Sequence, residues 1–421
     1  MTSSPILSPT AIPTGFQLKE LLSYNEKNII LSLSIVSGLL SFTGSITIVI
    51  MIIRQKRLSS TYGRLIFGMN CMSIMQSFAY CLSTIPAPSS SRLSENTWPY
   101  LGTSTTCSIQ GFFLYTGSTG TTIYYCTLCI YFVLVVLQHV TLNSIKHRFE
   151  PYLHAIPLIF SFTCGIFLAA TESFNSVGYV CSIATFPYQC HRLDPDTCTR
   201  GKNTLLYRIL FQLIPIVICF IIILVSMICL LSKVQRQRNL MQKYQYNVPD
   251  DALPDNNQRI KYPSRTSSRP PSSICTTSKN TTYRALQYIA VFFFTYIFAI
   301  INQTYVIITK KALIELLILQ QITLPAQGFF NFIVFMLPIV RTVQKIDPEI
   351  QLFKALLKAI VSIKKLDESK RDYRSKLDKL RKPSLSRKGF TTRELHQQEK
   401  DRDAALFILE VDGEELKEEE I

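Results

Sequence analysis

Four of the twelve cysteines, at the start of one apolar run and in the polar stretch between two later runs, are the residues best placed for covalent chemistry. Cys107 begins an apolar run, and Cys181, Cys190 and Cys198 share one polar stretch further along the chain. In an oxidising compartment such cysteines form disulfides. The spacing does not decide which of the three pairs with Cys107; we favour Cys190, which leaves Cys181 and Cys198 to each other. A metal site that includes neighbouring His191 is the less favoured alternative, and we expect no metal or other cofactor.

The sequence lacks the motifs of common membrane enzymes. It contains no His-Glu-x-x-His, no Gly-x-Ser-x-Gly and no pair of Asp residues within an apolar run. No residue is therefore assigned a catalytic role, and we expect that the protein is not an enzyme.

Uncharged polar side chains inside the apolar runs could bind a ligand instead. Pockets in helical bundles open between helices. The candidates are therefore polar residues near the end of the bundle at which Cys107 lies. Arg208, near a helix end, would also attract an anionic ligand. The candidate ligand-binding residues are Gln110, Tyr115, Thr119, Arg208, Gln212, Asn302, Gln303, Tyr305 and Gln320. A hydrogen bond to a neighbouring helix is an equally good explanation for any one of them.

Seven apolar runs have the length of a membrane-spanning helix, which needs about 20 residues. They occupy residues 29–53, 62–85, 106–137, 152–171, 205–231, 284–309 and 316–340. Barrel strands are shorter and alternate in polarity, so the sequence predicts an all-α membrane protein, a seven-transmembrane helix bundle spanning residues 29–340. Residues 1–28 would form an extracellular segment, 232–283 a disordered third cytoplasmic loop, 348–365 an amphipathic eighth helix, and 366–421 a cytoplasmic tail.

The charges between the runs predict the orientation of the bundle. The chain carries a net charge of +16, and nine Lys or Arg residues against three acids lie between Lys233 and Lys279. Positively charged loops stay on the cytoplasmic side. We therefore expect the N-terminus outside and the C-terminus inside, in a multi-pass protein of the plasma membrane. Anionic membrane lipid explains the positive charge better than nucleic acid does.

Two short motifs resemble those of the cyclic-AMP-receptor-like group of G-protein-coupled receptors, known from slime moulds. Residues 107–112 read Cys-Ser-Ile-Gln-Gly-Phe, similar to the Cys-x-x-Gln-Gly-Phe motif of that group. Residues 327–335 resemble its Gln-Gly-x-Phe-Asn-x-x-Val-Tyr stretch. The chain departs from the rhodopsin-like class, because it lacks Asp-Arg-Tyr after the third run, Trp-x-Pro in the sixth and Asn-Pro-x-x-Tyr in the seventh.

The resemblance implies a receptor that binds an unknown extracellular ligand within the bundle and activates a heterotrimeric G protein, with cyclic-AMP signalling as its context. The expected G-protein contacts are Arg57, His139, Lys146, Arg148, Lys233, Arg236, Arg284 and Arg341. Ser267, Ser268, Ser384 and Ser386 lie among basic residues and are candidate phosphorylation sites. The alternative is a seven-helix transporter or channel, although such proteins usually carry ionisable residues at mid-membrane.

Overall fold

The computed structural model describes residues 24–89, 100–138, 140–186, 190, 198–246, 272–309, 313–346 and 350–361. Six helices in this part of the chain are long and apolar enough to cross a membrane. Two shorter helices, bent by 49° at a break, make a seventh span if they count as one. The chain is therefore a helical, multi-pass membrane protein, as the sequence predicts.

The long helices follow one another along the chain. They are α2 (Tyr24–Arg54), α3 (Thr61–Leu82), α4 (Ser104–Val136), α6 (Glu150–Ala170), α9 (Ile214–Tyr246) and α10 (Ser272–Thr309). The bent pair is α11 (Ile314–Thr323) and α12 (Gln327–Ile346), and α13 (Leu352–Val361) follows it. The connecting segments are η1 (Arg57–Ser59), α5 (Leu142–Ser144), α8 (Thr204–Arg208) and two π-helical turns, η3 (Ile145–Phe149) and η5 (Ile209–Leu213).

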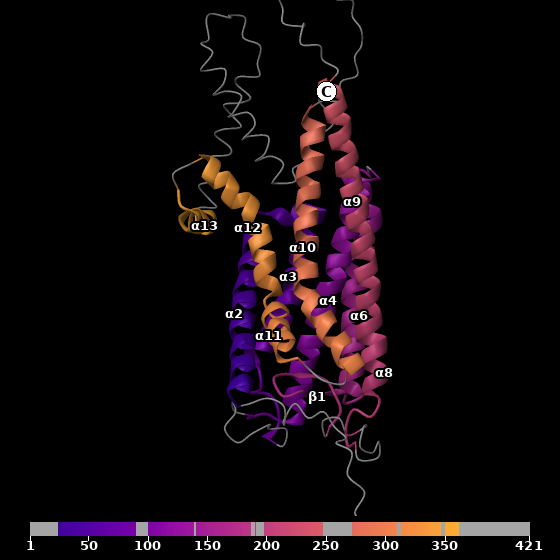
Figure 1. Cartoon of the computed structure of the whole chain (residues 1–421), viewed down its shortest axis with the longest axis vertical. Helices are drawn as coiled ribbons and strands as arrows, with labels where there is room; N and C mark the ends of the chain where they lie inside the picture. The colour runs from indigo at the N-terminus through magenta and orange to yellow at the C-terminus, as the bar shows by residue number, and fades with distance from the viewer. Residues whose placement is uncertain are drawn as a thin grey trace, which may run out of the picture.

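Helix α4 is the most central helix of the bundle (Figure 1), and α3, α6, α9 and α10 pack against it. The protein buries 83% of the apolar window of α4, but only 22% of the window in the span formed by α8, η5 and α9. An apolar helix that leaves most of its side chains uncovered suits contact with lipid chains. Helix α9 therefore faces the lipid, whereas α4 contributes the inner surface on which a site can be built.

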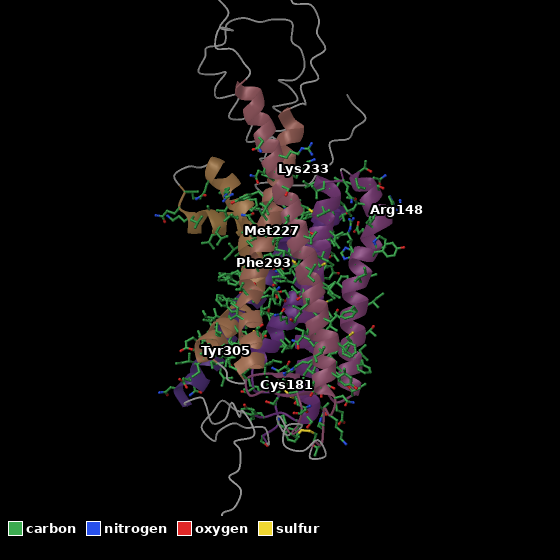
Figure 2. All side chains as sticks on the ribbon, turned by 45° about the vertical axis from the view of Figure 1, so that its right-hand side comes forward. Arg148, Cys181, Met227, Lys233, Phe293 and Tyr305 are labelled. Atoms are coloured by element: carbon green, nitrogen blue, oxygen red, sulfur yellow. A yellow bond between two sulfur atoms is a disulfide. The ribbon has the colours of Figure 1, made fainter. Side chains whose placement is uncertain are left out.

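The bundle has two unlike ends. A two-stranded antiparallel hairpin, β1 (Phe174–Ser176) and β2 (Cys181–Ile183), lies at one end, which we call the disulfide end. Arg148 and Lys233 lie at the opposite end, away from Cys181 (Figure 2), and we call this the basic end. The hairpin was not predicted, because strands of three residues are too short to show a periodic pattern.

Several predicted boundaries differ from the structure. Helix α9 continues to Tyr246 and α10 begins at Ser272, so the prediction of a disordered loop over 232–283 is wrong for both of its ends. The seventh predicted helix is broken between Thr323 and Gln327, because Pro325 lacks a backbone N–H and disfavours a continuous helix. Helix α13 lies within the predicted eighth helix. Residues 1–23 and 362–421 lie outside the described residues.

Polar caps fix where α3 and α4 begin. The Ser60 hydroxyl accepts a hydrogen bond from the Gly63 N–H at 3.1 Å. Thr103 and Thr106 form a capping box, in which the Thr103 hydroxyl accepts from the Thr106 N–H at 3.3 Å and the Thr106 hydroxyl accepts from the Thr103 N–H at 2.7 Å. These bonds satisfy N–H groups that a helix leaves without an internal partner.

Glycine allows α3 and α4 to approach closely. A Cβ atom added to Gly117 would lie 2.5 Å from the backbone nitrogen of Gln76 and 2.7 Å from the backbone oxygen of Met72. Backbone atoms cannot move aside without moving the helix. Small residues at such contacts are a general means of packing membrane helices, so Gly117 sets the distance between α3 and α4.

We expect Gly117→Ala to destabilise the protein by about 1–3 kcal/mol through overpacking. The matched control is Gly120→Ala, three residues further along α4, because a Cβ there meets mainly the flexible side chain of Met72 at 2.9 Å. Thermal unfolding of the purified protein in detergent measures both. Equal midpoints for the two variants would contradict the assigned role of Gly117.

Candidate functional site

The side chain of Gln110 on α4 forms hydrogen bonds with α3 and with the hairpin at the disulfide end. Its side-chain amide donates to the carbonyl oxygens of Ala79 at 2.8 Å and Ser83 at 2.7 Å. Its Oε1 accepts from the backbone N–H of Cys181 at 3.2 Å. Gln110 is 1% exposed. This predicted ligand-binding residue therefore joins α3, α4 and the hairpin within the protein.

Two disulfides lie at the same end of the bundle. Cys107 pairs with Cys181, with their Cα atoms 5.4 Å apart, and Cys190 pairs with Cys198, with their Cα atoms 5.3 Å apart. The preferred pairing of Cys107 with Cys190 is therefore wrong. The reason is the hairpin: strand β2 packs against α4 and brings Cys181 to Cys107, while Cys190 and Cys198 close a short loop beyond it.

Four more predicted ligand-binding residues, Tyr115, Arg208, Asn302 and Gln320, form hydrogen bonds within the protein near this end. The Tyr115 hydroxyl donates to the carbonyl oxygen of Phe211 at 2.8 Å, and a guanidinium nitrogen of Arg208 donates to the carbonyl oxygen of Ile183 at 2.8 Å. Asn302 of α10 donates its amide N–H to Oε1 of Gln320 on α11 at 2.8 Å. These contacts connect α4 to η5, α8 to the hairpin and α10 to α11.

The remaining four candidates do not gather around a common cavity in the described part of the chain. Thr119 and Tyr305 are half-buried, and Gln212 is exposed. The side chain of Gln303 lies outside the described residues.

A polar layer that the sequence analysis missed crosses the middle of the bundle. The Tyr125 hydroxyl of α4 donates to Oδ1 of Asn331 on α12, and the hydroxyls of Thr122 and Tyr296 are 2.6 Å apart. The amide of Gln327 lies close to the hydroxyls of Tyr125 and Tyr296. Among the described residues, the angles and distances are outside the range of a well-formed hydrogen bond for both polar atoms of that amide.

Serine hydroxyls of α2 and α3 lie beside the break between α11 and α12, at the start of α12. The Ser41 hydroxyl of α2 accepts from the backbone N–H of Gly328 at 2.9 Å and lies 2.7 Å from the Ser77 hydroxyl of α3. The Ser45 hydroxyl donates to the Ser73 hydroxyl at 3.1 Å. One N–H in the first turn of α12 is thus satisfied by another helix, as the lipid environment requires.

An ion pair holds α3 to α6 near the basic end. The guanidinium of Arg64 donates to both carboxylate oxygens of Glu150, and the Thr61 hydroxyl donates to Oε2 of the same carboxylate at 2.8 Å. His154 Nε2 lies 3.8 Å from Glu150 Oε1, and its Nδ1 lies 3.1 Å from the Tyr124 hydroxyl of α4. This group was not predicted, because Arg64 and Glu150 lie near the ends of α3 and α6, where charged residues are common in membrane proteins.

The ion pair also shapes the loop between α2 and α3. The third guanidinium nitrogen of Arg64, Nη1, donates to the carbonyl oxygens of Leu58 at 2.6 Å and Ser59 at 2.8 Å. Arg57 precedes these residues and begins the 3-10 turn η1. Its guanidinium carbon lies 5.6 Å from the centre of the Phe335 ring on α12. Arg64 therefore helps to set the position of Arg57.

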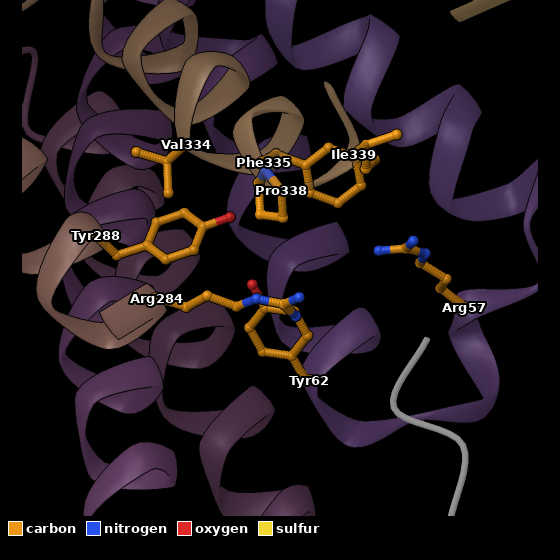
Figure 3. A pocket seen from close by; sticks show the side chains of 8 residues that line it. All are labelled: Arg57, Tyr62, Arg284, Tyr288, Val334, Phe335, Pro338 and Ile339. Atoms are coloured by element: carbon orange, nitrogen blue, oxygen red, sulfur yellow. The ribbon is translucent and has the colours of Figure 1, made fainter. Parts of the chain in front are cut away.

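A small pocket opens beside Arg57 at the basic end. It is lined by Arg57, Tyr62, Arg284, Tyr288, Val334, Phe335, Pro338 and Ile339, from the first loop, α3, α10 and α12. Its cavity volume is about 10 Å³, room for one water molecule. Figure 3 shows the guanidiniums of Arg57 and Arg284 reaching into the pocket from opposite sides.

The structure brings only two of the predicted G-protein contacts, Arg57 and Arg284, to this pocket. Arg341 and Arg148 instead lie over the rings of Tyr283 and Phe149, at 5.7 and 5.9 Å from the ring centres. Lys146 and Arg236 are exposed and Lys233 is half-buried. His139 and the four candidate phosphorylation sites lie outside the described residues.

The comparisons with known proteins give no family for this chain. No family model matches the sequence, and no curated protein matches it. Among the residues that the structure describes, no group of three or more His, Cys, Asp or Glu side chains could hold a metal ion.

We expect non-reducing peptide mapping to recover Cys107 linked to Cys181 and Cys190 linked to Cys198. The first disulfide joins residues 74 apart and the second residues 8 apart. Cys107→Ala/Cys181→Ala should therefore lower the free energy of unfolding by about 2 kcal/mol more than Cys190→Ala/Cys198→Ala, because the longer closed loop restricts the unfolded chain more. A peptide linking Cys107 to Cys190 would contradict the pairing.

Glu150→Gln should destabilise the protein by about 2–3 kcal/mol, because it leaves the charge of Arg64 without its carboxylate in a partly buried place. The matched control is Glu172→Gln at the other end. Its carboxylate lies 3.8 Å from Arg200 but is 62% exposed, so the expected loss is under about 0.5 kcal/mol. Thermal unfolding in lipid nanodiscs compares the two, and similar losses would show that the Arg64 ion pair contributes little.

Proposed function

We propose that this protein is a G-protein-coupled receptor with seven transmembrane helices, its N-terminus outside and its C-terminus inside the plasma membrane. In this proposal α11 and α12 together form the seventh helix, and α13 is an eighth, amphipathic helix at the cytoplasmic face. The two motifs that resemble cyclic-AMP-receptor-like proteins support the assignment. Each lies at a junction: Gln110 at the hairpin, and Gln327 to Asn331 in the polar layer.

The difference between the two ends is the observation that carries the proposal. The hairpin, held by the Cys107–Cys181 disulfide and by Gln110, lies at one end of α4. Extracellular thiols are oxidised, so that end belongs outside. Arg57, Lys146, Arg148 and Arg284 lie at the other end, which the positive-inside rule assigns to the cytoplasm.

The polar layer supplies a physical basis for a switch. Gln327 and Asn331 are 1% and 0% exposed, and both have polar atoms that make no well-formed hydrogen bond among the described residues. Such buried polar groups are costly, so another arrangement of α10 and α12 that pairs them would recover part of that free energy. An agonist that binds this second arrangement better would shift the population toward it.

A transporter is the second candidate, and the break between α11 and α12 favours it. Discontinuous helices line the substrate sites of many transporters. Against this, the polar layer contains hydroxyls and amides, and no Asp, Glu, Lys or Arg among the described residues takes part in it. Ion-coupled transport usually requires ionisable groups at that depth.

Coupling to a G protein is the first function to measure. The full chain, expressed at the surface of cells with a panel of Gα reporters, should respond to one of several ligand classes: cyclic nucleotides, amino acids, sugars or lipids. Lys233→Ala/Arg236→Ala should reduce the signal about five- to tenfold, equivalent to about 1–1.4 kcal/mol of lost contact with the G protein.

Lys202→Ala is the control, since it removes an exposed charge near the hairpin, at the opposite end, and should leave coupling unchanged. Silence across the panel from protein at the cell surface, together with uptake of a labelled compound, would replace the receptor proposal with the transporter.

A further inference from the structure

Two thiols from different helices lie close together in the interior of the bundle. Cys126 belongs to α4 and Cys219 to α9, and these two helices pack against each other. Both residues are buried in the same apolar core cluster, and their thiols lie within hydrogen-bonding reach of each other. Both cysteines are free. Two neighbouring free thiols are the reactants from which a disulfide forms on oxidation.

The thiol pair lies beside the polar layer. Cys219 is close to the hydroxyl of Tyr296, which takes part in that layer. The next residue on α9, Phe220, packs edge-on against Phe293 of α10, with the ring centres 5.0 Å apart. Helix α10 also packs against α4. A bond between the two sulfur atoms would therefore fix α9 to α4 at a point where α10 contacts both helices.

Helix α9 brings Cys219 near the hydrocarbon of the bilayer. Its neighbours Val217, Ile218 and Ile221 are exposed, and their span is the least buried of the six. A segment with few buried contacts opens locally at a lower cost in free energy than one that is held on all sides. An apolar molecule dissolved in the bilayer therefore reaches Cys219 more easily than Cys126, which lies on the central helix.

The hydrocarbon core differs from the cytoplasm in its redox chemistry. The thiol compounds that keep cytoplasmic cysteines reduced act from the aqueous phase, and charged groups are excluded from the core. Hydroperoxides of unsaturated lipid chains, in contrast, form inside the bilayer. A disulfide at this depth would be made by an oxidant of the lipid phase and would be shielded from the reductants of the aqueous phase.

We propose that Cys126 and Cys219 are a redox pair, which a hydroperoxide of membrane lipid converts to a disulfide. The Cys219 sulfur attacks the outer oxygen of the hydroperoxide and breaks the O–O bond, and the lipid alcohol leaves with the proton of the thiol. Cys219 is now a sulfenic acid. The Cys126 sulfur attacks the sulfenic sulfur, the S–S bond forms, and the hydroxyl leaves as water with the Cys126 proton. The two sulfur atoms together lose two electrons, which reduce the O–O bond.

The reaction needs neither a ligand nor a G protein, so it can be tested on the purified full chain in nanodiscs, independently of the receptor proposal. Cumene hydroperoxide is the apolar oxidant, and hydrogen peroxide at the same concentration is the water-soluble one. Free thiols are then blocked with N-ethylmaleimide, and non-reducing peptide mapping identifies the linked cysteines.

We expect a new peptide that links Cys126 to Cys219 and is lighter than its two separate parts by the mass of the two hydrogens lost. Cumene hydroperoxide should form it about tenfold faster than hydrogen peroxide does, because the apolar ring favours the bilayer over water. The wild-type result does not depend on any variant, so a variant that fails to fold leaves the test intact.

Cys126→Ser and Cys219→Ser should each abolish the link. In Cys126→Ser the sulfenic acid of Cys219 has no thiol to attack it and should accumulate, which labelling with dimedone measures. The matched control is Cys229→Ser on the same helix as Cys219, since Cys229 is exposed and lies outside the pair. Cys129→Ser is a second control, because Cys129 is one helical turn from Cys126 and close to Cys219. Both controls should keep the link.

The peptide maps decide the proposal. A link between Cys126 and Cys219 that both single variants lose and both controls keep supports it. Thiols that stay fully open to alkylation after oxidation overturn it, as does sulfinic or sulfonic acid on Cys219 without any link. A link from Cys219 to Cys129 overturns the pairing. An equal or faster reaction with hydrogen peroxide overturns the assignment of the oxidant to the lipid phase.

Discussion

The structure depends on one constraint: a lipid bilayer offers no hydrogen-bond partners, so each polar group inside it must find one within the protein. Helix α4 shows how this is met. Gln110 binds α3 and the hairpin, Thr122 meets Tyr296 of α10, and Tyr125 binds Asn331 of α12. Each of these hydrogen bonds joins α4 to a different element. The polar groups of α4 therefore help to set how the neighbouring helices are arranged.

The bundle has a first part, made of α2, α3, α4 and α6, and a second part, made of α10 to α12. The ion pair of Arg64 with Glu150 and the hydroxyl pair of Ser41 with Ser77 join helices of the first part. Buried polar atoms without a partner among the described residues occur in both parts, on Gln76 and Thr116 in the first and on Asn302 and Gln327 in the second. The second part also contains the break between α11 and α12, so we expect movement of α10 to α12 relative to the first part.

The sequence predicts the spans well and the contacts between them poorly, for physical reasons. Apolar length is a local property, so the first six helices follow from it. The Cys107–Cys181 disulfide depends on a hairpin whose strands have three residues each, and no periodic pattern marks them. Arg64 and Glu150 stand 86 residues apart, and only the packing of α3 on α6 makes them partners. The break at Pro325 did have a local signal, but the prediction drew one helix through it because the segments on both sides are mostly apolar.

The pocket at the basic end lies where these two parts meet. Arg57 belongs to the first part, through the loop that Arg64 holds, whereas Arg284 and Phe335 belong to α10 and α12. The contact of the Arg57 guanidinium with the Phe335 ring, at 5.6 Å, therefore crosses from one part to the other. If the parts separate during a switch, this contact exists in only one of the two states. A ligand shifts such an equilibrium only through a difference in affinity for the two states, so a partner that binds at this end would act by favouring or disfavouring the state in which Arg57 stacks on Phe335.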